Sequence, residues 1–215
     1  ANPDYLLSWG KVLLEDDKRP LEDRRDAAAE VWSRLAETRS QDAVTLSQIA
    51  DQLRSIDRSD DAIALYEKAI EMDPTAPQYR EYLGEYYHQL DRKEEAIQTW
   101  MSIAQGERRS RDSLVRLAEV FGTFKLQERA LAAWREAAEL DLTFPQELRF
   151  ARKLRDAKEF EESLARLDAA AKIAQTLDER EQLLKDRIVT YEQAGTLSQQ
   201  IARLQAADPT VENLR

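Results

Sequence analysis

The chain of 215 residues contains no cysteine and only one histidine. Without cysteine it can form neither a disulfide framework nor a zinc site built on thiolates. The histidine, His88, has no nucleophile placed beside it by a motif, and we expect it on a helix, facing solvent or a groove. The five glycines are scattered, so no glycine-rich phosphate loop is present. We therefore expect a protein that is not an enzyme and that binds no cofactor or metal.

Long apolar runs are also missing, because no segment approaches the roughly 20 consecutive apolar residues of a membrane-spanning helix. Five Gly, six Pro and 34% charged residues are typical of a soluble, helix-rich protein. The 42 acidic residues outnumber the 32 basic ones, which gives a net charge of −10 and disfavours non-specific contacts with phosphates. We expect no membrane partner and no nucleic-acid partner, and among compartments the cytoplasm is preferred.

A pattern with a period of about 34 residues runs through the chain. Its clearest copy is the stretch from Pro77 to Ala104, which reads as two amphipathic helices joined by a tight connection. In neighbouring copies Leu83-Gly84 recurs as Ile49-Ala50, Leu117-Ala118 and Phe150-Ala151, Ala96 as Ala62, Ala130 and Ser163, and Trp100 as Tyr66, Trp134 and Leu167. Two helices in each repeat predict a helical solenoid.

These residues resemble the tetratricopeptide repeat (TPR) family, whose pattern includes Leu-Gly, Tyr, Ala, an aromatic residue and a closing Asp-Pro. Leu83-Gly84, Tyr87, Ala96 and Trp100 match it, and Asp73-Pro74 closes the preceding repeat. The sequence departs from the pattern at four places: Arg80 replaces the first aromatic residue, Ile103 replaces the alanine of the second helix, and Arg108 and Leu142 replace the closing proline. The resemblance implies an all-α fold, a right-handed α-solenoid of about twelve helices in antiparallel pairs.

The repeats predict one solenoid domain over residues 1–215. Its expected parts are a divergent first helix pair at 1–42, repeats at 43–76, 77–110, 111–143 and 144–177, and a divergent last pair at 178–211. The first pair could instead be an unrelated capping hairpin, because only its second helix, with Ala28 and Trp32, keeps the register. In the last pair Lys185 and Leu197 replace small residues, so we expect its helices to splay apart.

Gly84 is costly inside a helix, since glycine is about 1 kcal/mol less favourable there than alanine. We expect it to let the partner helix lie against its backbone, with Ala96 doing the same from the other side. Trp100 and Trp134 are expected in the core. Acidic pairs such as Glu94-Glu95 precede second helices, where they complement the helix dipole, and a metal-binding role is the less favoured interpretation.

The resemblance also implies that the first helix of each repeat lines the concave face. There Asp51, Glu85 and Glu119 form an acidic row that ends at Arg152. The predicted peptide-binding residues are Asp51, Arg54, Glu81, Tyr82, Glu85, His88, Val115, Glu119, Arg152 and Arg155. An ordinary solvated helix face is the alternative interpretation of this row.

The sequence thus predicts a non-catalytic protein–protein interaction scaffold. Its partner would be a protein or peptide segment bound in the concave groove, with basic residues opposite the acidic row, while acidic segments would prefer the region of Arg152 and Arg155. We expect a monomer or a weak oligomer. The alternative function is a structural spacer or self-associating repeat array within a larger protein.

Overall fold

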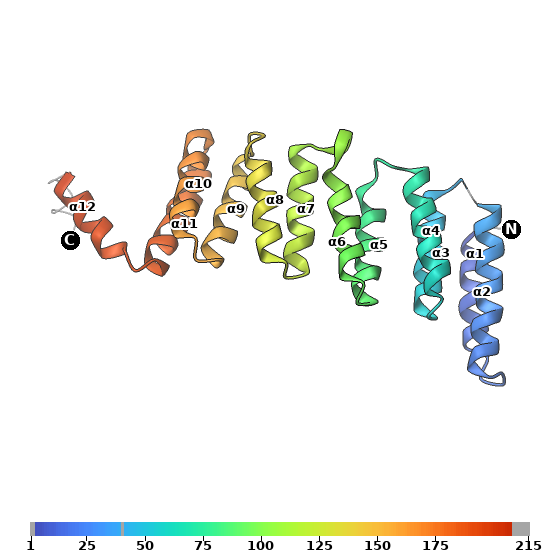
Figure 1. Ribbon diagram of the computed structural model, residues 1–215. Coiled ribbons are helices and arrows are strands. Elements are labelled where there is room, and N and C mark those ends of the chain that lie inside the picture. The colour runs from blue at the N-terminus through green and yellow to red at the C-terminus, as the bar shows by residue number, and fades with distance from the viewer. Residues whose placement is uncertain (1–2, 40, 208–215) are drawn as a thin grey trace. The chain divides into compact units, whose positions relative to one another are not determined.

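The computed structural model describes residues 3–39 and 41–207. It divides into two compact units, Ala1–Arg108 (unit 1) and Arg109–Arg215 (unit 2). The described residues form twelve α-helices and two short 3-10 helices, with no strand among them (Figure 1). The prediction of an all-α chain of about twelve helices is confirmed. None of the helices in the described ranges has an apolar stretch long enough to span a bilayer.

Unit 1 consists of three helix pairs. They are α1 (Pro3–Leu14) with α2 (Leu21–Thr38), α3 (Ala43–Ser55) with α4 (Ser59–Met72), and α5 (Pro77–Gln89) with α6 (Lys93–Met101), followed by η1 (Ser102–Ala104) and η2 (Gly106–Arg108). The second helix of each pair packs against the first helix of the next, α2 on α3 and α4 on α5. This stacking is that of an α-solenoid.

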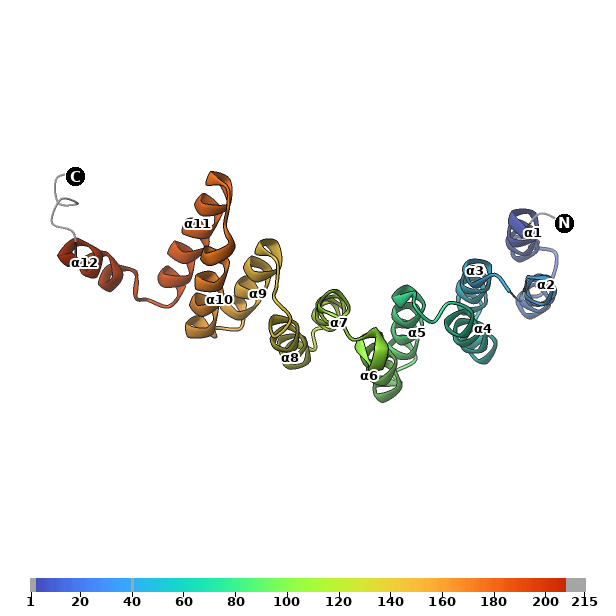
Figure 2. The same cartoon turned by 90° about the horizontal axis from the view of Figure 1, so that it is seen from above.

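Unit 2 also consists of three helix pairs. They are α7 (Arg111–Thr123) with α8 (Gln127–Ala138), α9 (Phe144–Asp156) with α10 (Phe160–Ile173), and α11 (Leu177–Gln193) with α12 (Leu197–Ala207). Within this unit α9, α10 and α11 lie side by side, and α12 diverges from them (Figures 1 and 2). The last pair is splayed, as predicted, and its expected end at residue 211 lies outside the described residues.

The turns within the pairs repeat one backbone conformation. Five of them contain a residue with a left-handed φ between 58° and 70°, namely Asp57, Asp91, Lys125, Lys158 and Gly195. In the α5–α6 turn the N–H of Arg92 then donates to the carbonyl of Tyr87 at 2.9 Å, and the other four turns have the equivalent bond. This is the hydrogen bond of a Schellman ending, which satisfies a helix carbonyl.

Glycine–tryptophan contacts hold two of the pairs in unit 1 together. A Cβ atom on Gly84 would lie 2.2 Å from Nε1 of Trp100, and a Cβ atom on Gly10 would lie 2.2 Å from Nε1 of Trp32. Each indole N–H donates to a carbonyl three residues before the glycine, Trp100 to Glu81 at 3.4 Å and Trp32 to Leu7 at 3.2 Å. The partner helix α6 therefore lies against the backbone of Gly84, as expected, and it does so through the indole ring of Trp100.

The first helix pair uses the same contact as α5 and α6, although its first helix is out of the 34-residue register. Trp32 lies 22 residues after Gly10, whereas Trp100 lies 16 residues after Gly84. The extra residues are divided between a longer α1–α2 turn and a longer first part of α2, so an insertion in this region accounts for the shifted register. This shared contact supports interpreting residues 1–42 as a divergent repeat.

Arg80, which stands where the repeat pattern expects an aromatic residue, is buried with 4% of its surface exposed. Its guanidinium Nη1 donates to the carbonyl of Pro74 at 3.0 Å. Burial, with the nearby charge of Arg108, lowers the pKa of Arg80. Arg80 therefore takes over the volume of the aromatic residue and fixes the turn that precedes α5.

Candidate interaction surface

The first helices of unit 1 are joined across the repeats by an ion pair. Nη2 of Arg54 on α3 donates to Oε1 of Glu85 on α5 at 2.7 Å, and the same oxygen accepts from Nε2 of Gln89 at 3.2 Å. The guanidinium also lies over the ring of Tyr86, 5.3 Å from its centre. We call the exposed surface of Asp51, Arg54, Glu81, Tyr82 and Glu85 the first-helix face of unit 1.

Asp51, the other acid of this face, is held by its own repeat. The hydroxyl of Tyr66 on α4 donates to Oδ1 of Asp51. Burial of the phenol and this hydrogen bond raise the pKa of Tyr66, so the hydroxyl stays protonated as a donor. The carboxylate of Asp51 is thus fixed in position at the surface of α3.

In unit 2 the charges of the first helices are paired in the same way. Arg149 on α9 donates to Glu119 on α7. Asp186 on α11 accepts from Nη2 of Arg152 at 2.6 Å and from Nη1 of Arg155 at 2.9 Å. Glu85, Glu119 and Arg152 of the predicted row are therefore members of ion pairs that link successive first helices within each unit, whereas Asp51 is bound by a tyrosine of its own repeat.

The ion pair of Asp186 is largely withdrawn from water. The side chains of Asp186 and Arg155 are 9% and 13% exposed, whereas that of Arg152 is 48% exposed. Burial alone would raise the pKa of Asp186, but the hydrogen bonds from Arg152 and Arg155 outweigh it and hold the pKa below its usual range. Arg155 is accordingly a structural partner of Asp186, and little of its side chain is accessible to a ligand.

The remaining predicted site residues differ in their exposure. Tyr82 is 40% exposed, whereas Val115 is only 7% exposed and belongs to the core of unit 2, so it offers little surface to a ligand. His88 is half-buried, with its ring 6.0 Å from the ring of Trp100. Glu81 is half-buried and accepts the indole N–H of Trp100 through its backbone carbonyl. The structure thus places six of the ten predicted residues together in unit 1, from α3 and α5.

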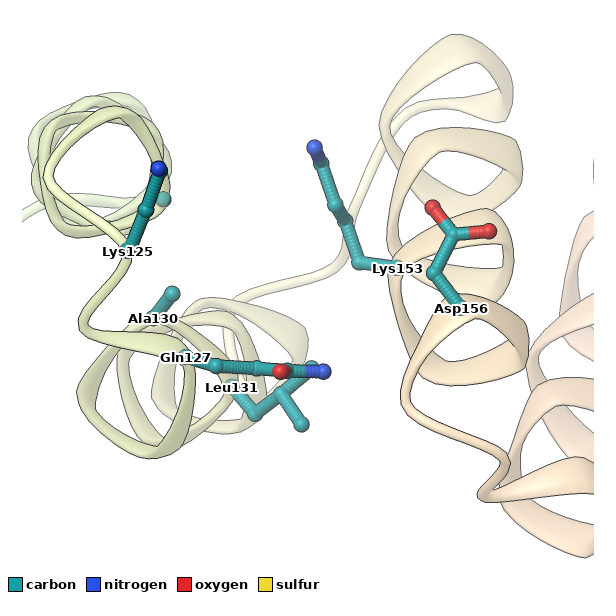
Figure 3. A pocket seen from close by; sticks show the side chains of 7 residues that line it. Lys125, Gln127, Ala130, Leu131, Lys153 and Asp156 are labelled. Carbon is teal, nitrogen blue, oxygen red and sulfur yellow. The ribbon is translucent and has the colours of Figure 1, made fainter.

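A pocket of about 290 Å³ opens in unit 2 between the α7–α8 turn and α9 (Figure 3). Figure 3 shows Lys125 and Gln127 entering from the turn and from α8, and Lys153 and Asp156 projecting from α9, with Leu131 below. Neither Lys125 nor Lys153 makes an ion pair among the residues that the structure describes. These two ammonium groups are the cations of this region that remain open to an acidic group.

The cross-repeat ion pairs were not predicted from the sequence, although the sequence carries a signal for them. The partners lie 31 residues apart for Arg54 and Glu85, 30 for Glu119 and Arg149, and 31 for Arg155 and Asp186. Opposite charges separated by slightly less than one repeat therefore mark neighbouring first helices. Over the described residues no group of three or more His, Cys, Asp or Glu side chains is arranged to hold a metal ion.

Comparison with known protein families finds tetratricopeptide repeats. Two family models described as tetratricopeptide repeat match the chain, one over residues 44–75 and the other over residues 65–98. No curated protein sequence matches the chain significantly. These matches cover α3, α4, α5 and the start of α6, the part of the chain where the 34-residue pattern is clearest.

Solved structures that resemble the chain are helical as well. A chain in the structure of Naa15/Naa10 bound to HypK-THB superposes with a TM-score of 0.51 and 14% identity, over 97% of this chain and 32% of that chain. YrrB, described as a TPR protein with an unusual peptide-binding site, gives a TM-score of 0.46 and 21% identity, over 78% of this chain and 86% of that chain. For pilF of Pseudomonas aeruginosa the TM-score is 0.43 and the identity 17%, over 96% and 92%. At these identities the likeness concerns the fold alone.

Proposed function

Because the chain is a tetratricopeptide repeat protein, we propose that it is a non-catalytic scaffold that binds a protein or peptide segment on its first-helix faces. The observation that supports this most directly is the first-helix face of unit 1. There the exposed ring of Tyr82 lies one helical turn from Glu85, and Arg54 ties Glu85 to the helix that carries Asp51. An exposed aromatic ring on the same face as two fixed carboxylates suits a peptide segment that carries an apolar and a basic side chain.

The carboxylates of this face keep acceptor capacity although they are paired. The hydrogen bonds of Glu85 use Oε1, and that of Asp51 uses Oδ1. A carboxylate has about four acceptor positions on its two oxygens. Oε2 of Glu85 and Oδ2 of Asp51 can therefore accept from a ligand without displacing Arg54 or Tyr66.

The ligand of this face is a segment with Lys or Arg and an apolar neighbour. On this face Asp51 accepts from Tyr66, Glu85 pairs with Arg54, and Glu81 is a further acid on α5. Each exposed ion pair contributes only about 0.2–1 kcal/mol. The charges therefore orient the partner, and packing on Tyr82 supplies the rest of the affinity.

Unit 2 would bind acidic groups of a partner, not basic ones. Arg152 and Arg155 are engaged by Asp186, so an acidic group would instead meet Lys125 and Lys153 at the pocket of Figure 3. Acidic segments are still expected to bind near Arg152 and Arg155, and the two lysines are the groups that would contact their carboxylates.

The test is a peptide array that varies charge and apolar content, followed by calorimetric titration of the best binder. The double variant Asp51→Asn with Glu85→Gln removes two charges from the first-helix face. Glu37→Gln with Glu71→Gln is the matched control, because these exposed acids of unit 1 lie on α2 and α4 and make no ion pair among the described residues. We expect the first variant to weaken the binding of a basic peptide by about 2- to 30-fold, from two pairs at about 0.2–1 kcal/mol each. Equal affinities for both variants would refute the site.

The second candidate function is a structural spacer or self-associating array. It is favoured by a separate observation, since apolar side chains on α1 and α12 are widely exposed. If no peptide on the peptide array binds selectively and the chain self-associates, this function is favoured over peptide recognition.

A further inference from the structure

The splayed last helix pair leaves an apolar groove open in unit 2. A cavity of about 430 Å³ lies between α11 and α12. Its apolar walls are Leu184, Ile188 and Tyr191 on α11, and Leu197, Ile201 and Leu204 on α12. The leucines and isoleucines at 184, 188, 201 and 204 are each between 42% and 65% exposed.

The groove has the spacing that accommodates a helix. On α11 the apolar residues recur at i, i+4 and i+7, from Leu184 to Tyr191, and on α12 at the same intervals from Leu197 to Leu204. The opposite side of α11 is occupied, because Leu183, Asp186 and Thr190 are buried there. Two apolar rows that face one opening form a common type of binding groove for an amphipathic helix.

The chain itself contains a helix of matching chemistry. On α1 the exposed residues Tyr5, Trp9 and Val12 also recur at i, i+4 and i+7, and the rings of Tyr5 and Trp9 are stacked with centres 6.5 Å apart. The other side of α1 carries Gly10, which packs on Trp32 of α2. The exposed row of α1 is therefore not used within its own helix pair.

Charge permits this match. The one charged residue that lines the groove is Arg187, which already donates to Asp168. Exposed Arg180 and Arg203 lie on the same two helices, and so do exposed acids such as Glu181 and Glu192. The apolar rows, and not the charges, therefore carry the match between α1 and the groove.

We propose that α1 of one copy docks in the α11–α12 groove of a second copy. The two surfaces differ, so the contact is heterologous, and the resulting pair of copies keeps one free α1 and one free groove. Further copies then add head to tail. The exposed apolar side chains of the two surfaces expose on the order of 700 Å² together, judged from about 150–250 Å² for a whole aromatic side chain; they are Tyr5, Trp9, Val12, Leu184, Ile188, Ile201 and Leu204. This area is below the roughly 1,200 Å² at which stable specific interfaces begin, so the association is weak and depends on concentration.

This contact uses none of the residues of the first-helix face. Its failure would leave the proposed peptide site untouched, and the absence of a peptide ligand would leave this contact untouched.

The test uses two full-length variants, Trp9→Glu and Leu204→Glu, with Met101→Glu as a matched control on exposed apolar surface of α6. Circular dichroism first checks that each variant is folded. In sedimentation experiments the parent and Met101→Glu should grow beyond dimers as the concentration rises. Each of the other two variants alone should associate at least about tenfold more weakly.

A mixture of Trp9→Glu and Leu204→Glu provides the decisive measurement. The first variant keeps its groove and the second keeps its α1, so we expect the mixture to form a one-to-one complex that grows no further. A parent chain that stays monomeric at about 1 mM would overturn the proposal. Sensitivity to Leu204→Glu but not to Trp9→Glu would also overturn it, because it would mean that the groove pairs with another groove.

Single cysteines provide a second measurement, since the chain has none of its own. Ser8→Cys lies beside the apolar row of α1, and Gln200→Cys lies in the groove. On mild oxidation we expect mixed disulfides between the two variants to exceed disulfides between identical copies at least about fivefold. Equal yields of all three products would contradict docking of α1 in the groove.

Discussion

Gly84 and Trp100 fit together so closely that the glycine has no room for a methyl group. The same is true of Gly10 and Trp32, whereas a Cβ atom on Gly122, near the end of α7, would meet no atom within 4 Å. All three glycines lie in helices, where alanine is favoured over glycine by about 1 kcal/mol. The contact with tryptophan, and not helix propensity, therefore decides the effect of a substitution.

We predict that Gly84→Ala destabilises the protein although alanine is the better helix former. Trp100 is fully buried, so its ring cannot move aside without disturbing the core. We expect a loss of about 1–3 kcal/mol, as for other overpacked cores. Gly122→Ala is the control and should leave stability unchanged or raise it, as measured by urea unfolding. A neutral or stabilising Gly84→Ala would show that the indole is not held where the structure places it.

Asp186 and Glu147 are two buried carboxylates of unit 2 whose pKa values move in opposite directions. The two arginines lower the pKa of Asp186. Burial raises the pKa of Glu147, and Arg166, with Nη1 3.7 Å from Oε1, offsets this only partly. Burial thus disfavours the charged form of both carboxylates, and only at Asp186 do the hydrogen bonds from arginine outweigh it.

We predict opposite pH dependences for Asp186→Asn and Glu147→Gln. The charge of Asp186 stabilises the fold above its unfolded pKa of about 3.9, and this contribution is lost as the pH falls. Glu147 contributes most below its unfolded pKa of about 4.3, and that contribution is lost as the pH rises through the raised folded pKa. Relative to the parent, Asp186→Asn should therefore become less destabilising towards pH 3, and Glu147→Gln should become more favourable towards pH 7. Urea unfolding across this range measures both, and parallel slopes would contradict the assignment.

At the scale of the helix, the sequence was sufficient to predict the helix pairs but not the contacts between one pair and the next. Leu83 and Trp100 lie on two helices of one pair, as predicted. Their pairing could be predicted because the residues that pack within a repeat lie within that repeat's own sequence. The bond between Arg54 and Glu85 depends on how two repeats are placed against each other, which local periodicity does not specify. Likewise, the burial of Arg80 could not be predicted, because only the fold shows that its guanidinium reaches the carbonyl of Pro74.

The two helices of the last pair contribute unequally to unit 2. On α11, Leu183 joins the cluster of Phe144, Leu148 and Leu167, whereas no described side chain of α12 is fully buried. Asp186 of α11 also holds Arg155 of α9. The stability of unit 2 should therefore depend on α11 and hardly on α12.

We predict that deleting residues 196–215 changes stability by no more than about 0.5 kcal/mol, as for exposed positions in general. Deleting residues 176–215 removes α11 as well and should cost at least about 2–5 kcal/mol, the range for losing one large buried side chain. The shorter deletion serves as the control for the longer one. Equal losses in urea unfolding would mean that α12 is packed more tightly than the structure indicates.

At the scale of the whole molecule, the net charge of −10 acts differently on the two proposed interactions. Copies of the chain repel each other at long range, so salt that screens this repulsion helps them to associate. A basic peptide is attracted to the first-helix face of unit 1, so the same salt weakens its binding. The salt response therefore separates the two surfaces without a substitution.

We predict that raising the salt from about 20 mM to about 300 mM, which shortens the Debye length from about 20 Å to about 6 Å, shifts the two equilibria in opposite directions. Self-association through α1 and the α11–α12 groove should strengthen or stay constant, because apolar burial carries it and screening removes the repulsion. Binding of a basic peptide should weaken by at least about threefold, because its orienting charges are exposed. Sedimentation and calorimetric titration measure the two on the same preparation, with an uncharged peptide as the control for general salt effects. If self-association weakened in parallel with peptide binding, charge pairing and not apolar contact would hold the copies together.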